Sequence, residues 1–113
     1  MSLIRTLMVG LAIAAAPIAG IASADDDSAL EQLMVESAST PAQHQALAKY
    51  YHSKAAAAKA EADNHRSMMR SYSGTSVPMA KQRAEHCNKL AALSDSEAAE
   101  YEKLAASHEA QAK

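Results

Sequence analysis

The chain has 113 residues, a formal net charge of −2 and a single cysteine, and 49% of its residues are hydrophobic although only 4% are aromatic. One cysteine excludes an intramolecular disulfide. The mild overall acidity gives no reason to expect nucleic acid as a partner.

Residues 1–24 have the features of a cleaved secretory signal peptide. Arg5 supplies a positive charge, Leu7–Ala16 is an apolar run, and Ala22-Ser23-Ala24 is a small-residue cleavage site. The apolar stretch is shorter than the roughly 20 residues of a membrane-spanning helix, and no later stretch is apolar enough. We therefore expect an exported chain, periplasmic or secreted, without stable membrane insertion. Loss of Arg5 lowers the basic residues from 11 to 10 against 13 acidic ones, a net charge of −3.

Residues 25–39 form an acidic segment in which we expect a short helix over 28–37. This helix carries three large apolar side chains, Leu30, Leu33 and Met34. Because so short a helix is marginal alone, its apolar edge is expected to dock near Leu47 and Leu104, or else to remain disordered.

Two alanine-rich series with alternating steps of four and three residues organise the rest of the chain. The first consists of His44, Ala48, Tyr51, Ala55, Ala58, Ala62, His65, Met69 and Tyr72. The second consists of Ala80, Ala84, Cys87, Ala91, Ser94, Ala98, Tyr101, Ala105, His108 and Ala112. Such steps place each series on one stripe of an α-helix, as in helices that pair along a seam. Folding the chain back near residue 76 pairs His44 with His108, Tyr51 with Tyr101, Ala58 with Ser94, His65 with Cys87, and Tyr72 with Ala80.

The chain from residue 40 to 113 is therefore predicted to be an antiparallel helical hairpin. Thr40 and Gln43 form a capping-box pattern around Pro41, which predicts a first helix over 41–72. The turn is expected at about 73–78.

Local signals also predict where the first helix ends and where the second helix begins and ends. Gly74 suits a left-handed cap of the first helix, and Ser76 is the expected cap of the second, with Pro78 in its first turn. That helix should reach about Gln111. Ser94 begins a further capping-box pattern, but the heptad phase continues through it and favours one unbroken helix.

The predicted fold is all-α: a long antiparallel hairpin with an alanine-rich heptad seam, plus a short N-terminal helix. Alanine lets helix backbones approach closely, but a buried Ala contributes far less than the roughly 1.5–3 kcal/mol of a buried Leu or Met. The outer apolar face therefore needs a cover. We predict either a homodimer, which would form an antiparallel four-helix bundle, or docking on a protein partner.

One cluster of donor side chains suggests a soft metal. It comprises His65, Met69, His86 and Cys87, which supply the nitrogen and sulfur ligands that copper takes. The leading interpretation of Cys87 is nonetheless a small buried hydrophobe, with a disulfide to a second copy or a metal thiolate as alternatives. His65 is more simply a hydrogen-bonded core imidazole, and Met69 a core side chain that fills a gap. His86 and Cys87 diverge by about 100° on one helix, so both cannot point into the seam.

His44 and His108 form a second pair at the open end of the hairpin. Two facing imidazoles would chelate a divalent metal, or would charge together and repel below about pH 6.5. The simpler interpretation is two exposed side chains near helix ends.

Basic residues gather near the turn. They are Arg66, Arg70, Lys81, Arg83 and Lys89, against Glu85 alone. This basic tip either contacts an anionic partner or is only a solvated helical end.

Enzyme signatures are missing from the sequence. The zinc-protease pattern that begins at His108-Glu109 fails at Ala112, and no haem attachment, phosphate loop or nucleophile elbow appears. We therefore predict a non-catalytic self-association or protein-binding module. The alternative is a periplasmic protein that binds or buffers copper.

Overall fold

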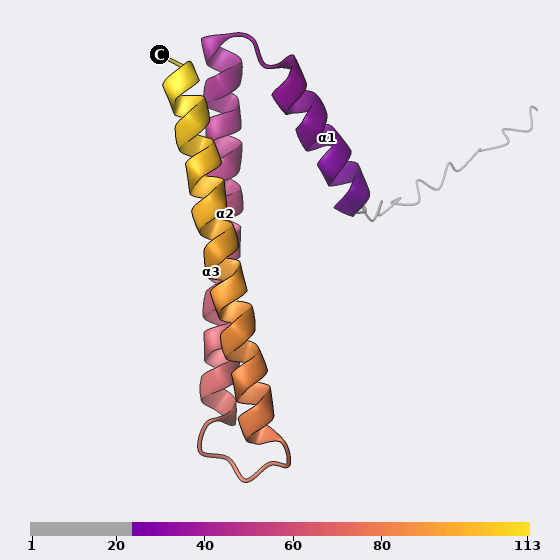
Figure 1. The fold of residues 1–113 in the computed structure, drawn as a ribbon, viewed down its shortest axis with the longest axis vertical. Helices are drawn as coiled ribbons and strands as arrows, with labels where there is room; N and C mark the ends of the chain where they lie inside the picture. Colours follow the sequence, from indigo (N-terminus) through magenta and orange to yellow (C-terminus); the bar gives the residue numbers. More distant parts are fainter. Residues whose placement is uncertain (1–23) are drawn as a thin grey trace, which may run out of the picture.

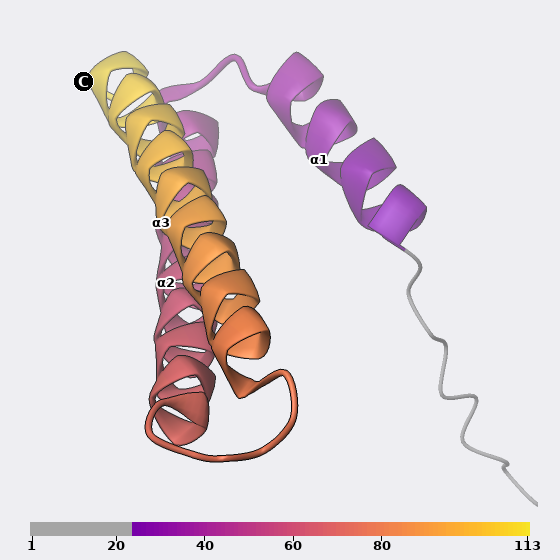
Figure 2. The same ribbon diagram turned by 60° about the horizontal axis from the view of Figure 1, so that its bottom comes forward.

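A computed structural model describes residues 24–113, which form three helices (Figure 1). The helices are α1 (Ala24–Ser37), α2 (Pro41–Tyr72) and α3 (Ala80–Gln111). α2 and α3 run antiparallel and side by side in both views, whereas α1 leans away from them as a separate arm (Figures 1 and 2). The predicted all-α fold with two long paired helices is confirmed. The predicted leader, residues 1–24, lies outside the described residues except for Ala24.

Helix α2 begins and ends where its sequence predicts. The Gln43 amide donates to Thr40 Oγ1 at 3.2 Å, and Gln43 Oε1 accepts from the Thr40 amide at 3.0 Å. These two bonds satisfy amides that a helix start leaves without partners.

No helix in the described part of the chain is long and apolar enough to cross a membrane.

The seam lies where the heptad pattern places it. Every member of the two alternating series is buried or half-buried. Among the described residues, Leu47 is the only buried residue outside the two series. Since most seam positions carry a methyl group, the two helices share a narrow core that runs along their whole length.

The turn differs from its prediction at one end. Gly74 adopts the predicted left-handed backbone with φ +78°. However, α3 begins at Ala80 and not near Ser76, because the Ala80 amide bonds to the Val77 carbonyl at 3.0 Å and closes a separate turn first. Met79 precedes the helix with φ 64° and no side-chain cap, so the prediction of Ser76 as the cap is wrong. α3 then runs unbroken past Ser94, as the heptad phase predicts.

Helix α1 starts four residues earlier than predicted and docks through only one of its three predicted apolar residues. Met34 and Ala38 pack against the buried cluster that contains Leu47, as expected for this end of the hairpin. Leu30 and Leu33, however, are exposed, so their predicted docking is wrong. Ala38 directly follows α1, and Glu31, one turn before Met34, also reaches the hairpin through Tyr51.

Candidate functional site

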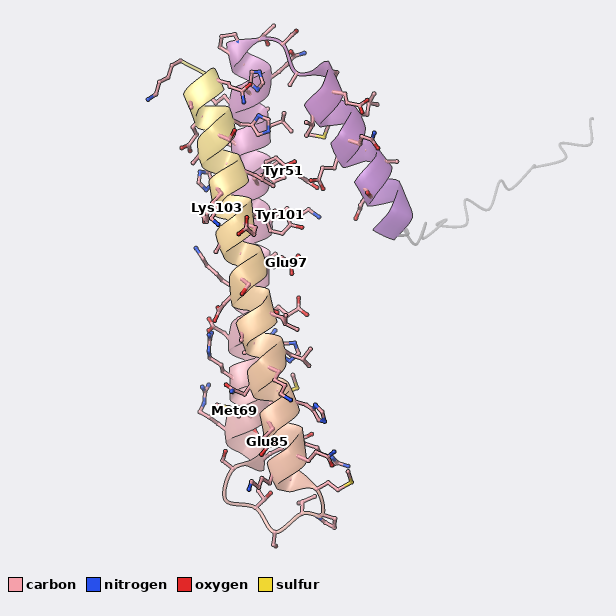
Figure 3. All side chains as sticks on the ribbon, in the orientation of Figure 1. Tyr51, Met69, Glu85, Glu97, Tyr101 and Lys103 are labelled. Carbon is pink, nitrogen blue, oxygen red and sulfur yellow. The ribbon has the colours of Figure 1, made fainter. Side chains whose placement is uncertain are left out.

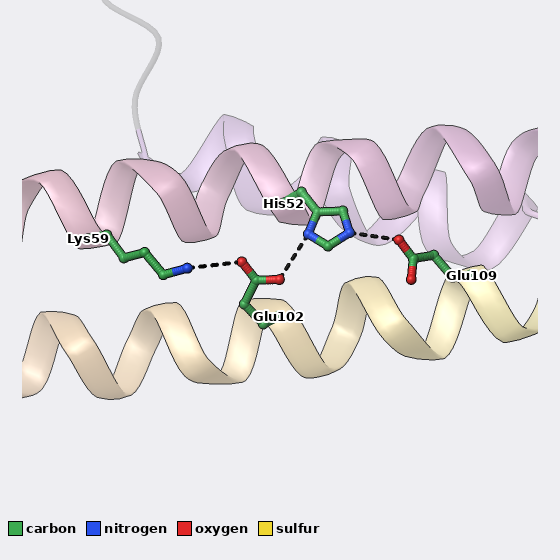
Figure 4. A network of polar contacts seen from close by, with 4 residues as sticks. All are labelled: His52, Lys59, Glu102 and Glu109. Carbon is green, nitrogen blue, oxygen red and sulfur yellow. Dashed lines mark hydrogen bonds and ion pairs between the residues drawn. The ribbon is translucent and has the colours of Figure 1, made fainter.

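The seam has two flanks of opposite chemistry, and the first is ionic. His52 of α2 lies between two carboxylates of α3: its Nδ1 is 2.9 Å from Glu102 Oε2 and its Nε2 is 2.7 Å from Glu109 Oε1 (Figure 4). Lys59 Nζ donates to the other oxygen of Glu102 at 3.2 Å. The bond to Glu109, followed by that to Glu102, raises the pKa of His52. Lys59 and then His52 lower the pKa of Glu102.

The ionic flank continues for one more heptad towards the turn. Arg66, seven residues after Lys59, pairs with Asp95 of α3 and also with Asp63 of its own helix. The cationic side chains of this flank therefore all lie on α2 and, apart from Asp63, their carboxylate partners lie on α3. All are partly or fully exposed, so each pair contributes little to stability. Their effect is to hold the register, since a shift of one heptad would leave charges unpaired.

The second flank carries large apolar side chains, among charged ones such as Lys54 and Glu61. Each of its hairpin residues directly precedes a seam residue, and those that remain exposed are Met68, Leu90, Leu93 and Leu104. Leu93 is 66% exposed. Helix α1 covers only the Leu47 end of this flank and adds the exposed Leu30 and Leu33 beside it. We call the surface formed by Met68, Leu90, Leu93 and Leu104 the apolar flank.

The largest buried side chains lie at the open end of the hairpin. Leu47, Tyr51 and Ala105 form a cluster that Met34, Tyr50 and Tyr101 cover. The Tyr51 hydroxyl donates to Glu31 Oε1 of α1 at 2.9 Å. Burial, reinforced by the Glu31 carboxylate, raises the pKa of Tyr51 to about 12. Figure 3 shows Tyr51 and Tyr101 projecting from the hairpin toward the side on which α1 lies. This hydrogen bond and the Met34 contact are what tether α1.

His44 and His108 meet in the predicted register. Their Nδ1 atoms are 3.0 Å apart, and the ring centres are 5.3 Å apart, so the two rings meet edge to edge. A metal ion between such head-on nitrogens would need about 4 Å between them, twice a metal–nitrogen bond. The distance instead fits one shared proton, with one imidazole donating to the other. His108 is buried and also lies against Tyr51, so it is not the exposed side chain that the simpler interpretation expected.

His52 and His108 are expected to give opposite pH dependences. Burial and then the neighbouring His44 lower the pKa of His108, so its contribution to stability is present above about pH 6.5 and is lost on acidification. The pKa of His52 is raised, so its contribution is present below about pH 6.5 and is lost as the pH rises. Besides His44, the titratable side chain that lies against His108 is Tyr51, whose hydroxyl is bonded to Glu31 of α1.

Urea unfolding of two variants between pH 5 and pH 8 tests this expectation. Relative to the wild type, His108→Phe should lose less stability on acidification, and His52→Gln should lose more. Both replacements keep the side chain's approximate size. Parallel pH profiles for the wild type and both variants would contradict the assignment.

The predicted soft-metal residues are only partly brought together. Cys87 is a buried free thiol, His65 and Met69 are half-buried, and His86 is exposed. His65 Nδ1 is buried without a hydrogen-bond partner, and its Nε2 lies 3.7 Å from Glu61. The expected backbone hydrogen bond of His65 is therefore not seen at this nitrogen. Across residues 24–113 no group of three His, Cys, Asp or Glu side chains is arranged to hold a metal ion.

The basic tip is smaller than its sequence suggests. Arg66 is engaged by Asp63 and Asp95, so it belongs to the ionic flank. Arg70, Lys81, Arg83 and Lys89 remain exposed. The Arg83 guanidinium lies 5.9 Å from the centre of the Tyr72 ring.

The ionic flank was not predicted from the sequence, since His52 lies off the two alternating series. The signal was present: His52, Lys59 and Arg66 each directly follow a seam residue of α2, as Asp95, Glu102 and Glu109 do in α3. Positions beside a seam are where paired helices place complementary charges.

The geometry defines this molecule as an antiparallel helical hairpin with one ion-paired flank and one apolar flank. No protein family, no curated protein and no solved structure matches the chain. Its function is therefore argued from its own side chains.

Proposed function

We propose that the protein is a self-association module and that the apolar flank is the surface that pairs two copies. The observation that carries this proposal is that the side chains of one flank have partners within the chain and those of the other do not. The ionic flank is satisfied within one chain, whereas four large apolar side chains of the hairpin stay in water on the other. These side chains are still 41–66% exposed, so burying the rest of each would contribute about 1 kcal/mol.

The charges beside the apolar flank favour a second copy as the occupant. Lys54 and Glu61 lie one heptad apart on α2, both directly before a seam alanine. A twofold axis between them would place Lys54 of each copy opposite Glu61 of the other, and such self-complementarity is what a symmetric dimer needs. Two hairpins packed in this way form an antiparallel four-helix bundle.

Sedimentation equilibrium of the mature chain tests the dimer. We expect a dimer at micromolar concentrations, and we expect Leu90→Gln together with Leu93→Gln to weaken it about tenfold or more, because both side chains would be buried in the pair. Ala92→Gln together with Ala99→Gln is the matched control, because these exposed positions lie on the other side of α3. A wild-type monomer, or equal weakening by both double variants, would contradict the proposal.

A second candidate function is the binding of a soft metal such as copper. Its support is two buried groups: the His65 nitrogen that has no hydrogen-bond partner, and the Cys87 thiol. The register that pairs His44 with His108, continued along the seam, also pairs His65 with Cys87. Met69, one turn after His65, would supply a weak third ligand. His86 is exposed and lies outside this set.

Titration of the reduced protein with Cu(I) against a chromophoric competitor tests this second function. We expect sub-micromolar affinity that is lost when His65 and Cys87 are both changed to Ala. His86→Ala should retain it, because that imidazole points away from the seam. Absence of competition by the wild-type protein would exclude the site.

A further inference from the structure

The turn between α2 and α3 presents apolar and basic side chains together at one end of the molecule. Val77 and Met79 are exposed, at 49% and 61%. Met79 holds a left-handed backbone, φ 64°, directly before α3. Non-glycine residues seldom adopt this conformation, and those that do cluster at functional sites. Neither side chain packs into the seam, so neither contributes to the hydrophobic core.

Cations flank this apolar pair on both sides along the chain. Arg70 ends α2, Lys81 and Arg83 open α3, and Glu85 is the one carboxylate in the same stretch of α3. These cations remain exposed, whereas Arg66 is taken up by the ionic flank. The tip is thus positively charged on a chain whose remainder is acidic.

The tip is also sterically free. Figures 1 and 2 show the turn at the end of the hairpin opposite the C-terminus and remote from α1. A flat surface can therefore meet the turn without touching the arm or the open-end cluster.

We propose that this tip docks on an anionic lipid bilayer, with Val77 and Met79 entering the headgroup boundary and the cations meeting lipid phosphates. Apolar side chains ringed by Lys and Arg are the combination that surface binding to anionic membranes uses. A soluble polyanion would engage the cations but would give the two apolar side chains nothing to enter. The docking is peripheral and needs no membrane-spanning segment.

Cosedimentation of the mature chain with lipid vesicles at pH 7.5 and low salt tests the proposal. We expect binding to vesicles that contain phosphatidylglycerol, weakening as salt rises, and little binding to pure phosphatidylcholine. Arg70→Gln with Lys81→Gln should weaken binding about 25-fold, at about fivefold per cation. Val77→Ser with Met79→Ser should weaken it about tenfold.

The matched control is Lys49→Gln with Lys113→Gln, which removes the same charge at the open end and should leave vesicle binding unchanged. Circular dichroism of each variant checks that the helices are intact. The proposal is overturned if the wild type does not bind the anionic vesicles, or if the control loses as much affinity as the tip variant. Unchanged binding by the Val77, Met79 variant also overturns it, because vesicle binding would then rest on the cations alone. Because the readout is vesicle binding, the result is independent of whether the protein dimerises.

Discussion

Replacement of Ala62 by Leu is expected to destabilise the hairpin by about 1–3 kcal/mol. Ala62 is fully buried in the seam, where helices joined through methyl groups leave no space for a larger side chain. Three added carbons must push α2 and α3 apart or take a strained rotamer. Urea unfolding followed by circular dichroism measures the loss, and the thermal midpoint should fall by about 4 °C or more.

Ala60→Leu is the control for this variant. Ala60 lies two residues away on the same helix and is exposed, so the same substitution should change stability by about 0.5 kcal/mol or less. Ala and Leu both favour helix, and propensity therefore contributes little to either result. Equal effects at the two positions would mean that the helices do not approach closely at Ala62.

Replacement of Leu47 by Ala is expected to cost about 2–5 kcal/mol. Leu47 is 2% exposed and is the largest fully buried side chain among the described residues. Its loss leaves a cavity under Tyr51 and removes the surface on which Met34 of α1 rests. Two readouts should change: the free energy of unfolding, and the protection of α1 amides from hydrogen exchange.

Leu93→Ala is the control for the Leu47 variant and removes the same atoms from an exposed site. At protein concentrations low enough to dissociate a dimer, it should cost about 0.5 kcal/mol or less. If Leu47→Ala costs no more than Leu93→Ala, the open-end cluster does not anchor the fold.

The sequence predicts the seam well because a heptad period is a property of local spacing. The pairing of His44 with His108 and of Tyr51 with Tyr101 follows from the fold-back point alone, and the structure confirms both pairs. The start of α2 is equally legible, since both halves of its capping box lie within four residues.

Features that depend on competition between groups are harder to predict. Ser76 is a competent cap, but the turn closed by Val77 and Ala80 displaces the start of α3. Of the predicted docking residues of α1, only Met34 reaches the hairpin, where Glu31 also accepts a hydrogen bond from Tyr51. Dimerisation, copper binding and export stay predictions, because each depends on a partner or a compartment outside one folded chain.

The uneven distribution of bulk along the hairpin has a consequence for how the molecule assembles. Near the turn, contacting residues such as Tyr72 and Arg83 are close in sequence and meet early, whereas His44 and His108 are 64 residues apart and close the longest loop. The two helices should therefore pair progressively from the turn outward, and each pair of seam alanines along the way adds little stability. Leu47, Tyr51 and Tyr101 lie at the far end, where closure costs the most chain entropy. That arrangement makes the last step the most favourable one, and should give a cooperative transition in place of gradual fraying.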